Sequence, residues 1–186
     1  MPEDRSDSEL LHRCAQGDEE AFGQLLERHQ NRIFALISRY VRDPATAEDL
    51  CQDTFFKVWK YSGSFRDRSA FTTWLYRLAV NTCLNHRETL KKHPLTIPLP
   101  PDCPDETGTA NDELTVSRRA ELLHQAITGL PDRQRMALLL AGFAGRSYEE
   151  IAGIMDTSVS SVESLLFRAR QNLAACLLPY KKRGEL

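Results

Sequence analysis

The segment covering residues 147–170 carries residue types and spacings that suit DNA binding. Ser147 and Glu150 form the capping-box pattern that begins a helix, and the polar residues 156–158 end it. The positions of the second helix that are spaced to face inward are Val159, Val162 and Leu166. Two helices joined by so short a break predict a helix-turn-helix, whose second helix lies in a DNA major groove. An ordinary helical hairpin is the alternative.

The outward face of that second helix holds side chains that can contact nucleic acid. Hydroxyl groups suit phosphates and either type of base, and arginine neutralises phosphate charge. The outward residues are Ser160, Ser161, Glu163, Ser164, Phe167, Arg168 and Gln171. Glu163 either accepts a hydrogen bond from a cytosine amino group or caps its own helix together with Ser160, and both interpretations stay open.

A second constellation lies in the first half of the chain and suits a protein partner. Its members follow the three- and four-residue spacing that places side chains on one helical face, opposite the apolar Leu50, Phe55 and Val58. They are Asp49, Gln52, Asp53 and Phe56. Two carboxylates, an amide and an aromatic ring presented together can contact a helix of another protein. A solvated acidic face is the alternative.

The distribution of charge also indicates a polyanionic partner. The formal net charge is −2, but residues 1–93 balance to zero, residues 94–117 carry −5 and residues 118–186 carry +3. Within the first block, residues 65–92 carry +4. Two basic regions on either side of an acidic connector suit a protein that contacts nucleic acid at two separate places. A solvated charged face is the alternative here as well.

The apolar residues outside the connector follow helical spacing, and no alternating strand pattern is convincing. The predicted fold is therefore all-α, with two small helical domains at residues 1–92 and 116–186. Residues 93–115 form a flexible linker that is rich in proline and acidic side chains. Such a linker can hold the two domains well apart.

Several classes of protein are excluded by composition. Hydrophobic residues make up 41% of the 186 residues and the mean hydropathy is −0.43, and the longest apolar stretch is too short to span a bilayer. No secretory signal begins the chain, so the expected location is the cytoplasm. The five cysteines form no CxxC pattern, so we expect no metal site and no cofactor, although Cys83 and His86 can share a helical face. No nucleophile with a base and no phosphate-binding loop is recognisable, so the protein is not expected to be an enzyme.

Taken together and in order, these motifs resemble the bacterial sigma-70-like factors of the extracytoplasmic-function (ECF) type. The likeness to sigma region 2 is carried by AEDLCQDTF at residues 47–55, FRDRSAF at 65–71 and TWLYRLAVNT at 73–82. The likeness to region 4 is carried by Leu130 with Pro131, SYEEIA at residues 147–152, VSSV at 159–162 and FRAR at 167–170. The resemblance covers nearly the whole chain.

The resemblance implies roles for individual residues of region 2. Asp49, Gln52 and Asp53 would contact the clamp coiled coil of the large RNA polymerase subunit, with Phe56 beside them. The loop at residues 65–71 would capture a flipped base of the promoter minus-10 element. The residues implied to contact that element are Arg66, Arg68, Trp74, Arg77 and Asn81. For Asn81, a plain role on the helix surface is the alternative.

The resemblance also implies a role for region 4 and a set of partners. Ser160, Ser161, Glu163, Ser164, Phe167 and Arg168 would face the minus-35 element. The protein would bind core RNA polymerase and promoter DNA, direct transcription initiation in the cytoplasm, and be held inactive by an anti-sigma factor. A stand-alone helix-turn-helix regulator is the alternative function, and it would bind duplex promoter DNA without polymerase.

Overall fold

The computed structural model describes residues 6–41, 43–66, 70–92 and 112–184, with side chains from residue 118 onward in the last range. Almost all of these residues are helical, and none of them forms a strand, so the all-α prediction is confirmed. Most of the predicted linker falls outside the described residues. A helix begins at Asp112, within the residues 93–115 that were predicted as linker.

An N-terminal unit is formed by the first five helical segments. They are α1 (Asp7–Cys14), α2 (Glu19–Tyr40), α3 (Pro44–Tyr61), the short 3-10 helix η1 (Ser62–Ser64) and α4 (Phe71–Lys92). Local capping begins α2 and α3, because the Asp18 carboxylate accepts from the Ala21 N–H at 3.0 Å and the Asp43 carboxylate accepts from the Thr46 N–H at 2.7 Å. Ser6 begins α1 through a capping box with Glu9.

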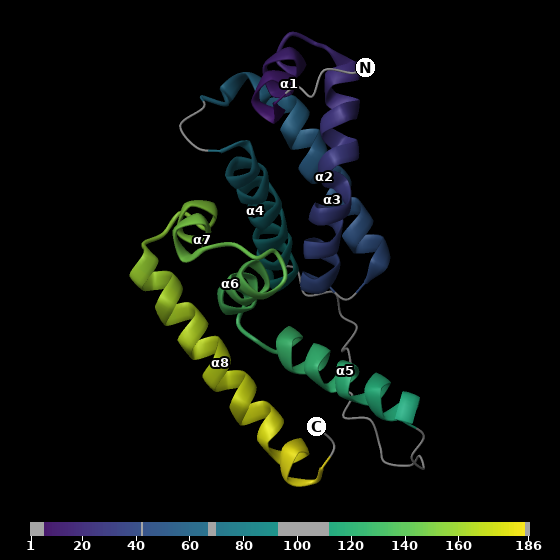
Figure 1. Ribbon diagram of the computed structural model, residues 1–186, viewed down its shortest axis with the longest axis vertical. Helices are drawn as coiled ribbons and strands as arrows, with labels where there is room; N and C mark the ends of the chain where they lie inside the picture. The colour runs from purple at the N-terminus through teal and green to yellow at the C-terminus, as the bar shows by residue number, and fades with distance from the viewer. Residues whose placement is uncertain (1–5, 42, 67–69, 93–111, 185–186) are drawn as a thin grey trace.

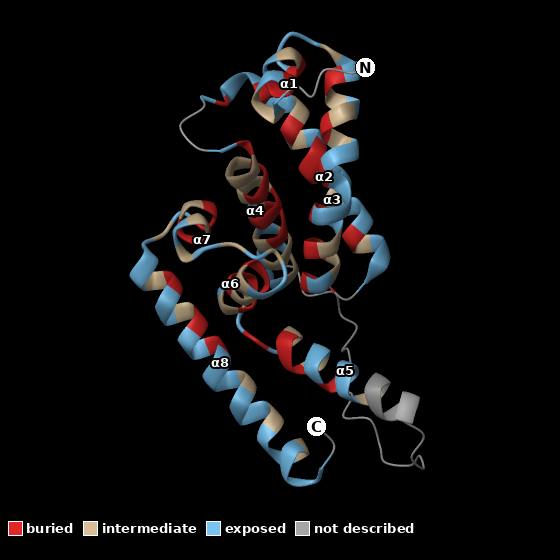
Figure 2. Cartoon of the chain, in the orientation of Figure 1, coloured by how far each residue is buried: buried red, intermediate tan, exposed pale blue. Residues whose placement is uncertain are grey.

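The core of the N-terminal unit lies between α1, α2, α3 and α4, each of which packs against the next (Figure 1). Fully buried side chains on α2 and α4 fill it, among them Leu25, Ile33, Ile37 and Leu75. Figure 2 shows these buried positions running along one stripe of each helix, as expected for amphipathic helices. The outer surface of α3 therefore remains available to partners, whereas α4 also packs against α6 and α7.

A C-terminal unit follows, containing α5 (Asp112–Thr128), α6 (Asp132–Gly142), α7 (Tyr148–Ile154) and α8 (Val159–Lys182). The capping box predicted at the start of α7 is confirmed: the Ser147 hydroxyl accepts from the Glu150 N–H at 3.2 Å, and the Glu150 carboxylate accepts from the Ser147 N–H at 2.8 Å. Helices α7 and α8 pack together as a helix-turn-helix, and Val162 and Leu166 of α8 are buried.

Two details of α8 differ from the sequence-based interpretation. The helix is capped by Ser158, whose hydroxyl accepts from the Ser161 N–H at 3.2 Å, so the cap is not made by Ser160 with Glu163. Val159 is the first residue of the helix and is exposed rather than inward-facing. Both differences follow from where the helix begins, because Ser158 is its N-cap and Val159 its first residue.

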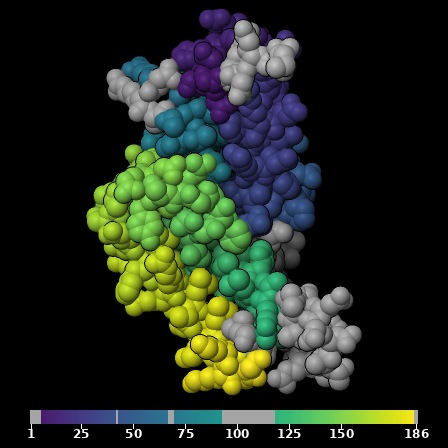
Figure 3. Space-filling view, in the orientation of Figure 1, coloured from purple at the N-terminus to yellow at the C-terminus, as the bar shows by residue number. Residues whose placement is uncertain are grey.

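The two units pack against each other rather than standing apart. Helices α6 and α7 lie against α2 and α4, and Figure 3 shows the C-terminal unit in contact with the N-terminal unit. The buried apolar residues of both units form one continuous cluster. The sequence analysis allowed the linker to hold the units apart, and in this structure they are in contact. The linker permits separation, but apolar surface on both units favours contact.

Candidate functional surfaces

The residues predicted to contact a partner helix lie together on the outer face of α3, which we call the docking face (Asp49, Gln52, Asp53 and Phe56). Asp49 and Gln52 are exposed, and Phe56 is 62% exposed, although it is a large apolar side chain. Asp53 is half-buried and paired with Lys57 at 2.8 Å. Lys57 also donates to the Thr82 hydroxyl at 2.9 Å, which ties the docking face to α4.

An apolar groove lies beside the docking face, between α2 and α3. It has a volume of about 550 Å³, and among its lining residues are Phe22, Leu26, Phe55, Phe56 and Trp59. The Phe22 and Trp59 rings meet edge-on, with centroids 5.3 Å apart. Helical spacing places Phe22 and Leu26 on an inward stripe, but in the structure they are only half-buried. The groove was not predicted, because periodicity does not reveal whether an apolar face is covered by the same chain.

The residues predicted to contact the minus-10 element are distributed between an aromatic cluster and the surface of α4. Phe65, Phe71 and Trp74 pack together, with Phe65 and Trp74 at 5.5 Å between ring centroids. Trp74 is therefore half-buried, and only part of its ring is available for stacking on a base. Arg66 is exposed beside the cluster, and Arg68 lies outside the described residues.

Two polar residues of α4 follow Trp74 on the same helical face, and we call Trp74, Arg77 and Asn81 the minus-10 face. The exposed side chain of Asn81 makes no hydrogen bond with any residue in the described ranges. Arg77 differs, because its Nε and Nη2 atoms donate to the backbone carbonyl of Gly153 in α7, at 3.0 Å and 2.5 Å. The structure thus places the three residues together but leaves only Asn81 without a protein partner.

The predicted DNA-facing residues of α8 share one exposed surface. Ser160, Glu163, Ser164 and Arg168 are exposed, Ser161 is half-buried, and Phe167 is 61% exposed. Ser160 and Ser161 each share a hydrogen bond with the Ser158 hydroxyl, at 3.0 Å and 2.8 Å. Among the described residues, Glu163 and Arg168 have neither a hydrogen bond nor an ion pair. This surface offers one carboxylate, one guanidinium and several hydroxyl groups to an external ligand.

The thiols of the N-terminal unit suit packing better than chemistry. Burial raises the pKa of Cys83 to about 12, and burial also raises the pKa of Cys14 and of Cys51. These thiols are protonated near neutral pH and are weak nucleophiles.

Across the described ranges, no three histidine, cysteine or acidic side chains come together as metal ligands. In the same ranges, no helix has the length and apolar character needed to cross a membrane.

Comparison with known families and proteins agrees with this geometry. Sigma-70 region 2 matches residues 25–93, and Sigma-70 region 4 matches residues 120–173. The chain is 37% identical over 191 residues to the RNA polymerase sigma-H factor of Pseudomonas aeruginosa, covering 93% of this chain and 94% of that protein. It is 35% identical over 192 residues to the ECF RNA polymerase sigma-E factor of Escherichia coli K12, covering 98% and 100%.

Two solved structures share the fold over most of both chains. CnrH, in complex with the cytosolic domain of CnrY, has a TM-score of 0.65 and 27% identity, covering 93% of this chain and 97% of that chain. The sigma factor RpoE of Bartonella quintana, in complex with the anti-sigma factor NepR, has a TM-score of 0.62 and 27% identity, covering 84% and 96%.

The match to both regions in one chain decides between the two functions that the sequence left open. A stand-alone regulator needs only the helix-turn-helix, whereas here the relatives align along the N-terminal unit as well. Members of this family bind core RNA polymerase and promoter DNA to initiate transcription and are not enzymes in their own right. The chain belongs to the sigma-70 family, as an RNA polymerase sigma factor of the extracytoplasmic-function type.

Proposed function

We propose that this sigma factor binds core RNA polymerase through the docking face, contacts the minus-10 element through α4 and reads the minus-35 element through α8. The observation that carries the proposal is an exposed aromatic ring, Phe56, placed beside an apolar groove and two carboxylates. A single exposed apolar residue is ordinary, but one that borders a groove of about 550 Å³ forms a surface fitted to another protein.

The docking face suits a helical partner that is both apolar and basic. The groove between α2 and α3 can accept apolar side chains of a helix, while Asp49 and Gln52 remain at its edge as polar contacts. Asp53, which is half-buried and paired with Lys57, adds a second carboxylate to the same edge. The clamp coiled coil of the large polymerase subunit is the partner that we assign to this face.

For the minus-10 element, the amide of Asn81 is the group that we assign to base recognition. An amide can donate to and accept from one base edge at the same time, which gives it sequence preference. Asn81 is exposed and its hydrogen-bonding capacity is not used within the described part of the chain. Arg77 and Arg66 supply positive charge nearby, and Trp74 offers a partial stacking surface.

For the minus-35 element, α8 supplies hydroxyl groups, Glu163 and Arg168. Because Ser158 caps the helix, Glu163 is not occupied as a capping residue and can accept from a cytosine amino group. We assign phosphate binding to Arg168, whose guanidinium is exposed.

We further infer that a protein inhibitor of the anti-sigma class controls this chain in the cytoplasm. Both solved relatives were captured with a protein partner: CnrH with the cytosolic domain of CnrY, and RpoE with the anti-sigma factor NepR. Core polymerase and promoter DNA are cytoplasmic in bacteria, so the cytoplasm is also the compartment in which the three surfaces can act.

The docking assignment can be tested by truncating Phe56. Phe56→Ala should weaken binding to core polymerase by about 1–4 kcal/mol, the range found for aromatic contacts at the centre of an interface. Phe34→Ala is the matched control, because Phe34 is a 37% exposed ring on α2 that does not line the groove. Equal core affinity for Phe56→Ala and the parent protein would refute the docking face.

A further inference from the structure

A second cavity, distinct from the apolar groove, contains none of the residues assigned to polymerase or DNA. Its volume is about 320 Å³, near the lower end of the range for small-molecule sites. Three guanidinium groups and two aromatic rings lie among its lining residues, and we call it the arginine pocket. They belong to Arg32 and Arg39 of α2, Tyr76 of α4, and Phe143 and Arg146 of the segment that joins α6 to α7.

Helical spacing places the two arginines of α2 on the same side of the pocket. Arg32 and Arg39 are about two helical turns apart, with the small side chain of Ala35 between them. Arg39 Nη1 donates to the Ala35 carbonyl at 3.0 Å, and its guanidinium lies 4.6 Å from the centre of the Phe143 ring. Arg39 is therefore held toward the C-terminal unit.

The segment between α6 and α7 positions the third guanidinium. Gly145 has a φ of +61°, a conformation that favours glycine, and the Arg146 N–H donates to the Leu140 carbonyl at 3.0 Å. The Arg146 guanidinium lies 4.4 Å from the centre of the buried Tyr76 ring, and its Nη1 pairs with Glu150 at 2.9 Å. Local backbone structure thus fixes this side of the pocket.

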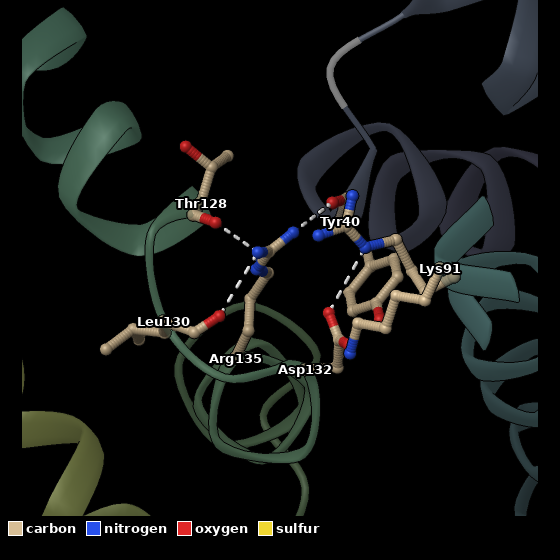
Figure 4. Close-up of polar contacts among 7 residues, drawn as sticks. Tyr40, Lys91, Thr128, Leu130, Asp132 and Arg135 are labelled. Atoms are coloured by element: carbon tan, nitrogen blue, oxygen red, sulfur yellow. Dashed lines mark hydrogen bonds and ion pairs between the residues drawn. The ribbon is translucent and has the colours of Figure 1, made fainter. Parts of the chain in front are cut away.

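A buried arginine holds the walls from the two units together. Arg135 of α6 is 3% exposed, and its Nη1 donates to the Tyr40 carbonyl, at the end of α2, at 3.0 Å (Figure 4). Figure 4 also shows Asp132, which pairs with Lys91 at 2.5 Å. The cations drawn there already have acceptors within the chain, which is not true of the arginine pocket.

The arginine pocket carries an excess of positive charge. None of the described residues that line it is acidic. Glu150 offsets the charge of Arg146, but Arg32 and Arg39 form no ion pair in the described ranges, and Arg32 makes no hydrogen bond there either. The Arg146 Nε atom is buried without an acceptor in the same ranges. Two positive charges therefore remain available to a ligand.

A phosphate group matches this excess of charge. A phosphate monoester carries a charge of about −1.5 to −2 near neutral pH, whereas a carboxylate carries a single negative charge. Guanidinium groups bind phosphate oxygens through charge-assisted and often bidentate hydrogen bonds. The Phe143 ring is 55% exposed and can contact a flat ring attached to the phosphate.

We propose that the arginine pocket binds a small ligand that carries a phosphate group, through Arg32, Arg39 and Arg146. The ligand contacts α2 and the segment between α6 and α7 at the same time. This assignment does not rest on the proposed function, because the polymerase and DNA surfaces use other residues.

The pocket can be tested by isothermal titration calorimetry of the full-length protein, at constant ionic strength and without polymerase or DNA. The probes are inorganic phosphate, AMP and adenosine. Phosphate and AMP should bind at one site per chain, and adenosine should not bind, because it lacks the phosphate group. Tighter binding of AMP than of phosphate would identify a nucleotide as the ligand, and equal affinities would identify the phosphate group alone. Failure of both phosphate and AMP to bind, or binding of adenosine as tight as that of AMP, would overturn the proposal.

Arg32→Gln tests whether the bound phosphate lies in the pocket. Arg32 is exposed and has no partner in the described part of the chain, so the fold should not depend on it. The variant should bind AMP about tenfold or more weakly, as expected for the loss of a charge-assisted hydrogen bond. Arg119→Gln is the matched control, because Arg119 is exposed on α5 and does not line the pocket.

Thermal unfolding gives a second measurement on the same variants. AMP should raise the Tm of the parent protein and of Arg119→Gln, and should raise that of Arg32→Gln less at the same concentration, because only ligand bound to the folded state stabilises it. Unchanged AMP affinity in Arg32→Gln would overturn the proposal. Equal weakening by Arg32→Gln and Arg119→Gln would also overturn it, because binding would then follow the net charge of the chain.

Discussion

The docking face of α3 and the minus-10 face of α4 belong to adjacent helices of one unit, yet only the first is uncovered. The groove beside the docking face is lined by α2 and α3 alone, whereas Arg77 on α4 is held by the backbone of α7. In this arrangement of the two units the groove is open to a partner helix, whereas the Arg77 guanidinium is already bound to a carbonyl of the same chain. Two adjacent helices can therefore present predicted contact residues to different degrees, because the C-terminal unit covers only one of them.

The largest expected effect tests whether the docking face binds polymerase. Gln52→Ala combined with Asp53→Ala should weaken core binding by a few kcal/mol, because central interface contacts contribute about 1–4 kcal/mol each. Loss of the Asp53 pair with Lys57 should matter little for folding, since exposed pairs four residues apart on a helix contribute about 0.3–0.5 kcal/mol. Titration of labelled core polymerase measures the affinity, with Glu48→Ala, also exposed on α3, as the control.

Helical content of the double variant should match that of the parent protein by circular dichroism. Co-purification with core polymerase at parental levels would show that the docking face has been misassigned.

Asn81 is the residue of the minus-10 face that has no hydrogen-bond partner in the described part of the chain. Asn81→Ala removes a donor and an acceptor, so holoenzyme should lose about 1–3 kcal/mol on the preferred minus-10 sequence and much less on a mismatched one. Binding of holoenzyme to matched and mismatched promoters measures this loss of discrimination. An equal loss of affinity on every promoter would show that Asn81 is a residue of the helix surface that reads no base.

The α8 surface provides a contrast, because it is exposed whether the units are together or apart. Arg168→Ala should weaken binding to matched and mismatched promoters alike and reduce the salt slope of holoenzyme binding by about one unit, as expected for one lost phosphate contact. The measurement is affinity across a salt series. An unchanged slope would mean that Arg168 does not reach a phosphate.

The smallest expected effect concerns the pH dependence of the contact that Asp132 makes between the two units. Burial raises the pKa of Asp132, but hydrogen bonds and ion pairs from Lys91 and Arg87 outweigh burial and hold that pKa below the ordinary 3.8. The carboxylate therefore stabilises the contact between the two units at pH values above 3.8, and this contribution is lost as the pH falls through the lowered pKa. The Asp132→Asn variant lacks this stabilising contribution at every pH.

Small-angle scattering of the parent protein and Asp132→Asn, from neutral pH downward, measures this contribution. The parent should be the more compact of the two near neutrality, and the difference should shrink in acid. A difference that persists at low pH would assign the compaction to other contacts.

Local signals in the sequence account for most of the helical pattern. The caps at Asp43 and Ser147 are satisfied three residues away, so they could be read directly from the residues that follow them. The docking face was predictable for the same reason, since a three- and four-residue spacing fixes a helical face. The sequence left the cap of α8 open because Ser158 and Ser160 are both acceptable caps, and in the structure Ser158 caps the helix.

The groove and the contact between the two units were not predictable from such signals. Phe22 and Leu26 have the periodicity of core residues, and only the absence of a covering helix in the described structure leaves them lining a groove. Arg87 belongs to a basic region that suits a polyanion, but in the folded chain its partner is Asp132. Charge counts show how much positive charge a segment carries, and they do not show which acceptor is nearest.

The family, the helical class, the caps at Asp43 and Ser147 and the candidate residues for polymerase and DNA contact could be derived from the sequence, because each depends on neighbours a few positions apart. Which of these residues are covered depends on contacts between distant parts of the chain. Arg77 donates to a carbonyl 76 residues away, and Arg135 to one 95 residues away. Their acceptors are the backbone carbonyls of Gly153 and Tyr40. Because every residue carries a backbone carbonyl, no side-chain pattern marks the two that join the units.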